Sequence, residues 1–342
     1  MRVAIRLVLG LVLLAVLAGA GYAGVWFYAA NAAESQVREW AKAREADGYR
    51  ITIGAITTAG FPQTIAMTAR DVAVAKPNDP IAWRWTAESI VANRKVYGSS
   101  NVAVAVVGSQ TLAYRIGPEE KTARIQTRRF AIDVRPGNNA LIIDIAALVL
   151  TPEADAAPIT MKSGSFRVTL GDGDAAIPEG TRTIARIDTL VIPDNRRGPL
   201  GDTIDLLTSD FTTSRALDTF SLPGALDRWR LAKGYLNLKA SELRWGTLNM
   251  AFTGLLSVDD QYRPTGYLNA TIKDFSQAID AFFAAGRIDA KARADVTTMM
   301  GFLQSRGGGG GVGLPIEITA GEVDVGAMKL GTVPPLFPRL SP

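Results

Sequence analysis

Residues 235–272 read YLNLKASELRWGTLNMAFTGLLSVDDQYRPTGYLNATI, and this stretch decides the fold class. Apolar and polar side chains alternate along it, so that Leu248, Met250 and Phe252 fall on one face of an extended chain. Residues 259–264 carry Asp-Asp and Pro, which favour a turn. The pattern therefore predicts a meander of antiparallel strands at residues 235–243, 245–258 and 266–272.

The same period of two continues on both sides of this stretch. Runs rich in Thr, Val, Ile and Ala, separated by Gly, Pro and Asn-Asp, begin after Gly48. They predict strands at residues 49–57, 65–69, 81–92, 102–107, 111–116, 123–134, 140–150, 159–170 and 183–192, and a last pair at 314–320 and 322–330.

One of these runs changes its facing part of the way along. Ile125 places the apolar side chains on odd positions, whereas Phe130, Ile132 and Val134 place them on even positions. One extra residue in a strand produces such a change. We therefore expect a β-bulge near Arg128 and Arg129.

Helical signals are few. Residues 274–286 carry apolar side chains at helical spacing behind a capping box, and residues 289–303 predict a second helix packed beside the first. Residues 194–201 and 202–231 interrupt the strands and are expected to form a loop and one or two short helices. The glycine run at residues 307–311 is expected to be a flexible tether.

The amino-terminal segment carries no charge from residue 7 to residue 30. Its 30 − 7 + 1 = 24 residues would form a helix of about 36 Å, long enough to cross a bilayer. Tyr22, Trp26, Phe27 and Tyr28 gather at its far end, as aromatic side chains do at a membrane interface. The alternative is a cleaved signal peptide that ends at residues 18–20, but the ten following residues remain apolar.

Charges on the two sides of this segment suggest an orientation. Arg2 and Arg6 have no acidic neighbour, whereas Arg38, Lys42 and Arg44 are interspersed with glutamates. We expect residues 1–6 to be a cytoplasmic tail, residues 7–30 a transmembrane anchor, and residues 31–342 a β-rich periplasmic domain with possible halves at 48–193 and 234–342.

Composition excludes several kinds of chemistry. The chain of 342 residues contains neither cysteine nor histidine, so disulfides, cysteine nucleophiles, Ser-His-Asp triads and the usual zinc sites are excluded. The net charge is only +4, and the 27 arginines are scattered, which argues against nucleic-acid binding.

The remaining candidates for chemistry have simpler explanations. Asp172-Gly173-Asp174 lacks the rest of a calcium loop, and the pairs Asp259-Asp260 and Glu119-Glu120 lie in polar turns. Trp83 and Trp85 share one strand face, where core or interface packing is commoner than stacking on a sugar or a headgroup. We therefore expect a non-enzymatic protein with no catalytic, cofactor or metal site.

The shortage of helices leaves a question about the strand faces. Each apolar strand face must be covered by another sheet, by helices, or by something from outside the chain. One alternative is a closed sheet sandwich, and the other is a long, curved, mostly antiparallel sheet whose apolar face accepts a lipid acyl chain.

Several short motifs resemble a known family. Gly60-Phe61-Pro62 at a strand entry, Trp245-Gly246-Thr247-Leu248, Leu314-Pro315-Ile316 and the closing residues 330–336 are similar to the domain of unknown function 2125 family of Gram-negative bacteria. That resemblance covers nearly the whole chain and implies no catalytic residues. More distantly, Gly-x-Leu strands such as residues 234–236 resemble AsmA-like envelope proteins, which are implicated in phospholipid movement, although this chain is too short to bridge a periplasm.

Together these features predict the function. We expect a single-pass inner-membrane protein whose periplasmic α+β domain, mainly β, handles phospholipid or supports envelope homeostasis. The alternative is a structural module that binds another envelope protein.

Overall fold

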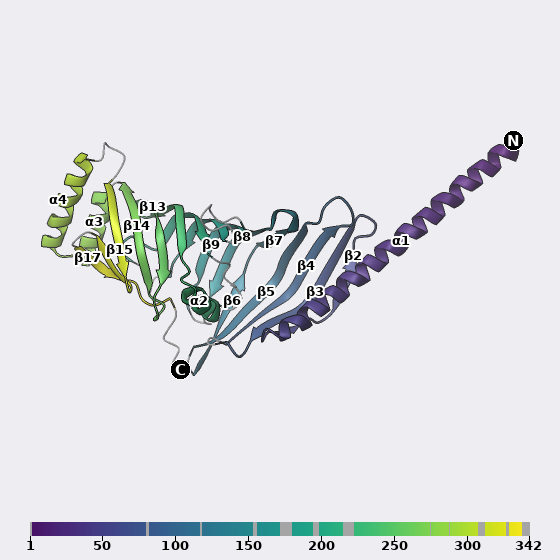
Figure 1. The fold of residues 1–342 in the computed structure, drawn as a ribbon, viewed down its shortest axis with the longest axis horizontal. Helices are drawn as coiled ribbons and strands as arrows, with labels where there is room; N and C mark the ends of the chain where they lie inside the picture. Colours follow the sequence, from purple (N-terminus) through teal and green to yellow (C-terminus); the bar gives the residue numbers. More distant parts are fainter. Residues whose placement is uncertain are drawn as a thin grey trace.

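The computed structural model describes residues 2–336, apart from residues 80–81, 117, 153–155, 172–179, 194–197, 215–221, 274, 287, 307–311 and 326–327. Side chains are described from residue 21 onward, apart from those same residues and residues 116, 222–225, 292, 303–306, 328 and 330–331. Figure 1 shows one long twisted sheet, with the helix α1 at one end and the helices α3 and α4 at the other.

Seventeen strands of the described chain join this one sheet. The first nine are β1 (Arg50–Thr52), β2 (Ile56–Ala59), β3 (Thr64–Lys76), β4 (Trp83–Lys95), β5 (Val102–Ile116), β6 (Glu119–Gln126), β7 (Arg129–Arg135), β8 (Ala140–Thr151) and β9 (Ile159–Leu170). The rest are β10 (Thr181–Val191), β11 (Thr203–Thr213), β12 (Leu236–Trp245), β13 (Leu248–Val258), β14 (Pro264–Lys273), β15 (Val312–Thr319), β16 (Glu322–Val325) and β17 (Met328–Thr332).

The sheet is a meander over most of its length. From β8 to β17 every strand pairs antiparallel with the next strand in the sequence. Near the other end β1 and β2 both pair with β3, while β6 and β7 both lie between β5 and β8. The prediction of a mainly β, antiparallel fold is confirmed, and the strands form a single sheet rather than the two sheets of a sandwich.

The predicted bulge lies where the structure interrupts a strand. β6 ends at Gln126 and β7 begins at Arg129. The two strands keep one register against β8, but their pairing with β5 shifts by one residue between Gln110↔Ile125 and Ala105↔Ala131. The change in apolar parity thus marks a real irregularity.

Four α-helices accompany the sheet in the described chain: α1 (Arg2–Glu45), α2 (Leu222–Leu231), α3 (Phe275–Ala284) and α4 (Ala290–Arg306), with one short 3₁₀ turn, η1 (Pro136–Asn138). The hairpin of α3 and α4 confirms the helical prediction for this region. The interpretation of residues 202–231 as loop and helix was wrong in part, because Thr203–Thr213 is strand β11.

The long turn before β14 is stabilised by one carboxylate. Asp259 Oδ1 accepts hydrogen bonds from the backbone N–H groups of Gln261 and Arg263, each at 2.9 Å. Its Oδ2 accepts a 2.7 Å hydrogen bond from the Arg263 guanidinium. This Asx-type turn closes the hairpin over the five residues 259–263, so β14 begins earlier than the predicted residue 266.

Helix α1 continues without a break from the expected anchor into the domain (Figure 1). Within the part of the chain whose side chains are described, no helix meets the length and apolarity that a membrane crossing requires. The side chains of residues 7–20 of the expected anchor are not among those described. The glycine run 307–311 and Asp172-Gly173-Asp174 lie outside the described residues altogether.

Candidate functional site: an apolar sheet face

Strand register shows which side chains share a face of the sheet. Residues directly opposite one another in an antiparallel pair point to the same side, and side chains alternate along each strand. Val104, Ile132, Ile143 and Phe166 are consecutive partners across β5, β7, β8 and β9. Four large apolar side chains of neighbouring strands therefore stand together on one face.

The same face remains apolar across the sheet. A row here is the line of directly paired residues that crosses the sheet from strand to strand. We define the apolar face by three rows, and a row of the opposite face lies between each two of them. From β3 to β15 these rows are, first, Ile65, Arg94, Val102, Val134, Leu141, Val168, Thr183, Phe211, Leu238, Gly254, Leu268 and Ile316; second, Met67, Ala92, Val104, Ile132, Ile143, Phe166, Ala185, Ser209, Ser241, Phe252, Ala270 and Leu314; third, Ala69, Ile90, Val106, Phe130, Ile145, Gly164, Ile187, Leu207, Leu243, Met250, Ile272 and Val312.

The opposite face, called the polar face below, carries the rows in between. Its ion pairs join neighbouring positions of the sheet, with closest N–O distances from 2.6 to 3.3 Å: Arg135–Asp133, Arg182–Asp210, Arg186–Asp188 and Arg244–Glu242. These ion pairs thus lie on one side of the sheet, and the three rows of the other side are mainly apolar, with Arg94 as their charged residue and Thr183, Ser209 and Ser241 as their hydroxyl-bearing ones.

A line of irregular residues crosses the strands and preserves this division. Asp71, Gly108, Ala147 and Thr189 have positive φ angles inside β3, β5, β8 and β10. On β9, a Cβ added to Gly164 would lie 2.9 Å from Met161 Cε, so these two positions share a face although they are three residues apart. At this line a bulge-like residue shifts the side-chain alternation of its strand by one position, so that apolar side chains remain on the apolar face.

Helices cover the apolar face at its carboxyl-terminal end. Met300 of α4 packs with Val312, Leu314 and Val325 in the main buried cluster, and α3 contributes Ile279 at its margin. At the opposite end α1 contacts β1 and β3. From β4 to β12 no described helix or strand makes comparable contact with the sheet, and the side chains of the apolar face there are mostly only partly buried.

The total surface area reflects this open architecture. The accessible surface is 20633 Å². A compact globular protein of 36.4 kDa exposes about 13,500 Å² by mass scaling. The protruding part of α1 accounts for on the order of 2,000 Å² of the excess. A sheet that lacks a second layer over its middle also exposes more surface than a compact fold.

Shifted pKa values occur mainly at surface ion pairs. A hydrogen bond from Arg182 lowers the pKa of Asp210, and one from Arg186 lowers the pKa of Asp188. Burial, together with a hydrogen bond to Asp227, raises the pKa of Tyr262. These shifts favour the ionised carboxylates, so their physical role is to stabilise the polar face.

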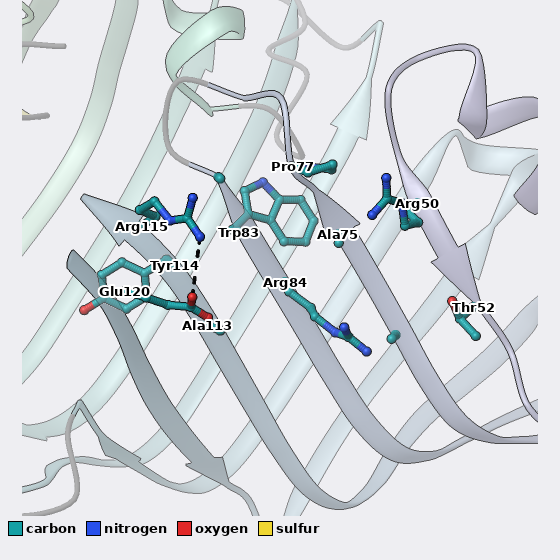
Figure 2. A pocket seen from close by; sticks show the side chains of 12 residues that line it. Arg50, Thr52, Ala75, Pro77, Trp83, Arg84, Ala113, Tyr114, Arg115 and Glu120 are labelled. Carbon is teal, nitrogen blue, oxygen red and sulfur yellow. Dashed lines mark ion pairs between the residues drawn. The ribbon is translucent and has the colours of Figure 1, made fainter. Parts of the chain in front are cut away.

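A hollow in the surface lies over β1, β3, β4 and β5, near the end of α1 (Figure 2). It has a volume of about 210 Å³ over a floor of small side chains that includes Ala73, Ala75 and Ala113. Arg50 and Arg84 are the partners of Ala75 on its two sides, and Figure 2 shows both guanidinium groups over β3. The hollow offers positive charge to an anion, but all of its charged side chains are exposed.

The residues singled out from the sequence are spread over the molecule. Trp85 Nε1 donates a 3.3 Å hydrogen bond to the buried Gln110, and the Trp83 ring lies 6.4 Å from that of Tyr49. Glu119 and Glu120 lie at the β5–β6 turn, where each makes a loose ion pair of 3.6 to 3.8 Å. Trp85 thus packs within the protein, whereas Trp83 also lines the hollow that holds Arg50 and Arg84, and among the described residues no three side chains are grouped as metal ligands.

The comparisons with known proteins identify the family of the chain. Neither the curated proteins nor the solved structures include a match to the chain. The distant resemblance to AsmA-like proteins therefore stays a prediction. One family model, described as "Uncharacterized protein conserved in bacteria (DUF2125)", matches residues 26–334. Since these 334 − 26 + 1 = 309 residues form most of the chain, the protein belongs to the DUF2125 family.

Proposed function

We propose that this protein is a membrane-anchored, non-enzymatic component of the bacterial envelope whose apolar face holds lipid acyl chains. One observation carries the proposal: between β4 and β12 no described helix or strand contacts the sheet as closely as α3 and α4 do at its carboxyl-terminal end. A partly exposed apolar surface that crosses so many strands is unusual in a soluble monomer and indicates a binding surface.

The dimensions of the face suit a lipid. Strands β4 to β12 occupy eight neighbouring positions in the sheet, because β6 and β7 share one. At about 4.8 Å per step the face is roughly 34 Å long. Each leaflet of a bilayer contributes about 15 Å of hydrocarbon, so acyl chains fit along the face with room to spare.

The composition of the face favours hydrocarbon over protein as its occupant. Within the three rows, β5 to β10 contribute Val, Ile, Leu, Phe, Ala and Gly, and one Thr at position 183. Protein interfaces carry a hydrogen bond for every 100–200 Å² or so, and these rows offer almost no donors or acceptors for them. An acyl chain needs none.

The anchor and the topology complete the proposal. Residues 7–30 remain the candidate membrane segment because they carry no charge. Residues 1–6 then lie in the cytoplasm, and the sheet lies in the periplasm next to the inner membrane. A phosphatase reporter fused after Pro342 should be active only if the carboxyl terminus lies outside the cytoplasm.

Partner binding is the second candidate. Within the described chain β17 pairs only with β16, so its other edge has free backbone groups to which a strand of another envelope protein can add.

Photocrosslinking in cells separates the two candidates. Ile142 and Ile143 are neighbouring isoleucines of β8, and only Ile143 lies on the apolar face. With a photoreactive phenylalanine analogue at position 143 of the full chain, we expect crosslinks to phospholipid, detected by mass spectrometry. The matched variant at position 142 should give none. Crosslinks from position 143 to protein alone would overturn lipid binding and favour the second candidate.

A further inference from the structure

Four aromatic side chains form a cluster where α1 first meets the sheet. We call Tyr22, Trp26, Phe27 and Phe61 the aromatic collar. The first three lie on α1, and Phe61 lies in the loop between β2 and β3. The Phe61 ring centroid is 6.2 Å from that of Tyr22, 5.6 Å from that of Trp26 and 6.5 Å from that of Phe27.

Two hydrogen bonds fix the helix to this loop. Trp26 Nε1 donates to the backbone oxygen of Thr64 at 2.9 Å, and the Tyr22 hydroxyl donates to the backbone oxygen of Pro62. Trp26 is only 4% exposed, and so is Ala30 one turn further along. The far end of the expected anchor therefore packs against the domain, and loop and helix form one unit.

The outer side of the collar remains uncovered. Phe27 is 60% exposed, Phe61 is 51% exposed, and the neighbouring Val25 and Tyr28 are 60% and 77% exposed. Burying a Phe or Val side chain completely is worth about 1.5–3 kcal/mol, so a cluster of half-exposed ones is unfavourable in water. Aromatic side chains at the end of an apolar helix are favourable at a bilayer interface.

Charge is absent from both chain segments that meet here. Residues 7–33 contain no charged residue, and neither do residues 51–69. The first charges on the helix beyond the collar are Glu34 and Arg38, which pair with each other at 3.0 Å. An uncharged loop held beside an uncharged helix is the composition that the interfacial region of a membrane accepts.

We propose that the collar and the loop at residues 60–62 insert into the bilayer interface and dock the amino-terminal end of the sheet on the membrane. This inference rests on the proposed function, since it requires α1 to be embedded in a bilayer. Residues 7–26 then span the hydrocarbon, because 26 − 7 + 1 = 20 residues form about 30 Å of helix. Trp26 and Phe61 lie at the boundary.

Docking in this way places the apolar face at the membrane surface. Thr64 begins β3, and the next residue, Ile65, starts the first row of the apolar face, followed by Met67 in the second. An acyl chain leaving the outer leaflet beside the collar would meet this edge of the apolar face first. The collar is thus the entry side of the proposed lipid surface.

Site-specific fluorescence tests the docking in the full chain. The absence of native cysteine allows a single label at Phe61→Cys or Tyr28→Cys. The control is Glu119→Cys, because Glu119 is exposed at the turn between β5 and β6, at the end of the strands opposite to the collar. Each labelled chain is reconstituted into phosphatidylethanolamine–phosphatidylglycerol vesicles with or without a lipid that carries a quencher just below the headgroup.

We expect the quencher lipid to reduce fluorescence about twofold or more at positions 61 and 28, and to leave position 119 unchanged. If the chain floats with the vesicles but the labels at 61 and 28 remain unquenched, docking by the collar is wrong while the anchor stands. If the chain does not float with the vesicles, the anchor fails, and the collar fails with it.

Discussion

Replacing Gly266 by alanine should destabilise the sheet far more than the same change at Gly313. Gly266 lies in β14 with φ +144°, a conformation that an L side chain rarely adopts. A Cβ at this position would lie 2.1 Å from the backbone oxygen of Leu255 on β13. At Gly313 of β15, in contrast, an added Cβ meets nothing within 4 Å, and φ is not positive.

The magnitude follows from two costs at Gly266. Forcing alanine into this backbone conformation costs about 1–3 kcal/mol. Restoring an ordinary contact with the Leu255 oxygen requires the strands to separate by about 1 Å, which weakens at least one ladder hydrogen bond worth about 1 kcal/mol. The free energy of unfolding should therefore fall by about 3 kcal/mol, which corresponds to about 4 °C in Tm for a chain of 342 residues.

Thermal unfolding followed by circular dichroism in the β-sheet region measures the difference. Gly313→Ala should raise Tm slightly, because glycine inside a strand is about 0.5–1 kcal/mol less favourable than alanine. If Gly266→Ala unfolds at the same temperature as Gly313→Ala, the close approach of Leu255 on β13 to Gly266 on β14 is wrong.

Three further predictions concern other parts of the molecule. Arg182 lowers the pKa of Asp210 below its usual 3.8, so the stability that this pair contributes is present above pH 3.8 and is lost as the pH falls further. The variant Asp210→Asn should therefore show a smaller fall of Tm in acid. An unchanged dependence of Tm on pH would refute the linkage. Met300→Ala should cost about 2–5 kcal/mol in denaturant titrations, whereas Leu231→Ala, at a site 72% exposed, should stay within about 0.5 kcal/mol. Trp26→Ala should free α1 from the sheet, so that limited proteolysis between helix and β1 accelerates while the circular dichroism of the sheet is unchanged; equal proteolysis rates would contradict this.

Local pattern was sufficient to predict most of the strands. Side-chain alternation is a property of one extended segment, so Leu248, Met250 and Phe252 reveal their shared face without any knowledge of neighbouring strands. The same reasoning located the irregularity near Arg128, because a bulge changes the parity within a single run. The helical hairpin was equally visible, since helical periodicity is also local.

Strand β11 was missed for a local reason as well. Leu206 and Leu207 are adjacent, so they break the alternation, and the rest of Thr203–Thr213 is largely Thr, Ser and Asp. In the structure Leu207 joins the apolar face, while Leu206 is buried on the polar face at 3% exposure. Only the pairing with β10 and β12 makes this segment a strand.

The sequence by itself determined most of the elements, the apolar side of most strands and the uncharged anchor segment, because each depends on residues close together in the chain. Tertiary structure alone decided that the strands add in order to one sheet, since alternation does not say whether a second sheet covers an apolar face. It also decided the contact of Trp26 with Phe61, two residues 35 positions apart in the sequence. The face that carries the proposed function arises from strand register, in which side chains from twelve strands lie side by side.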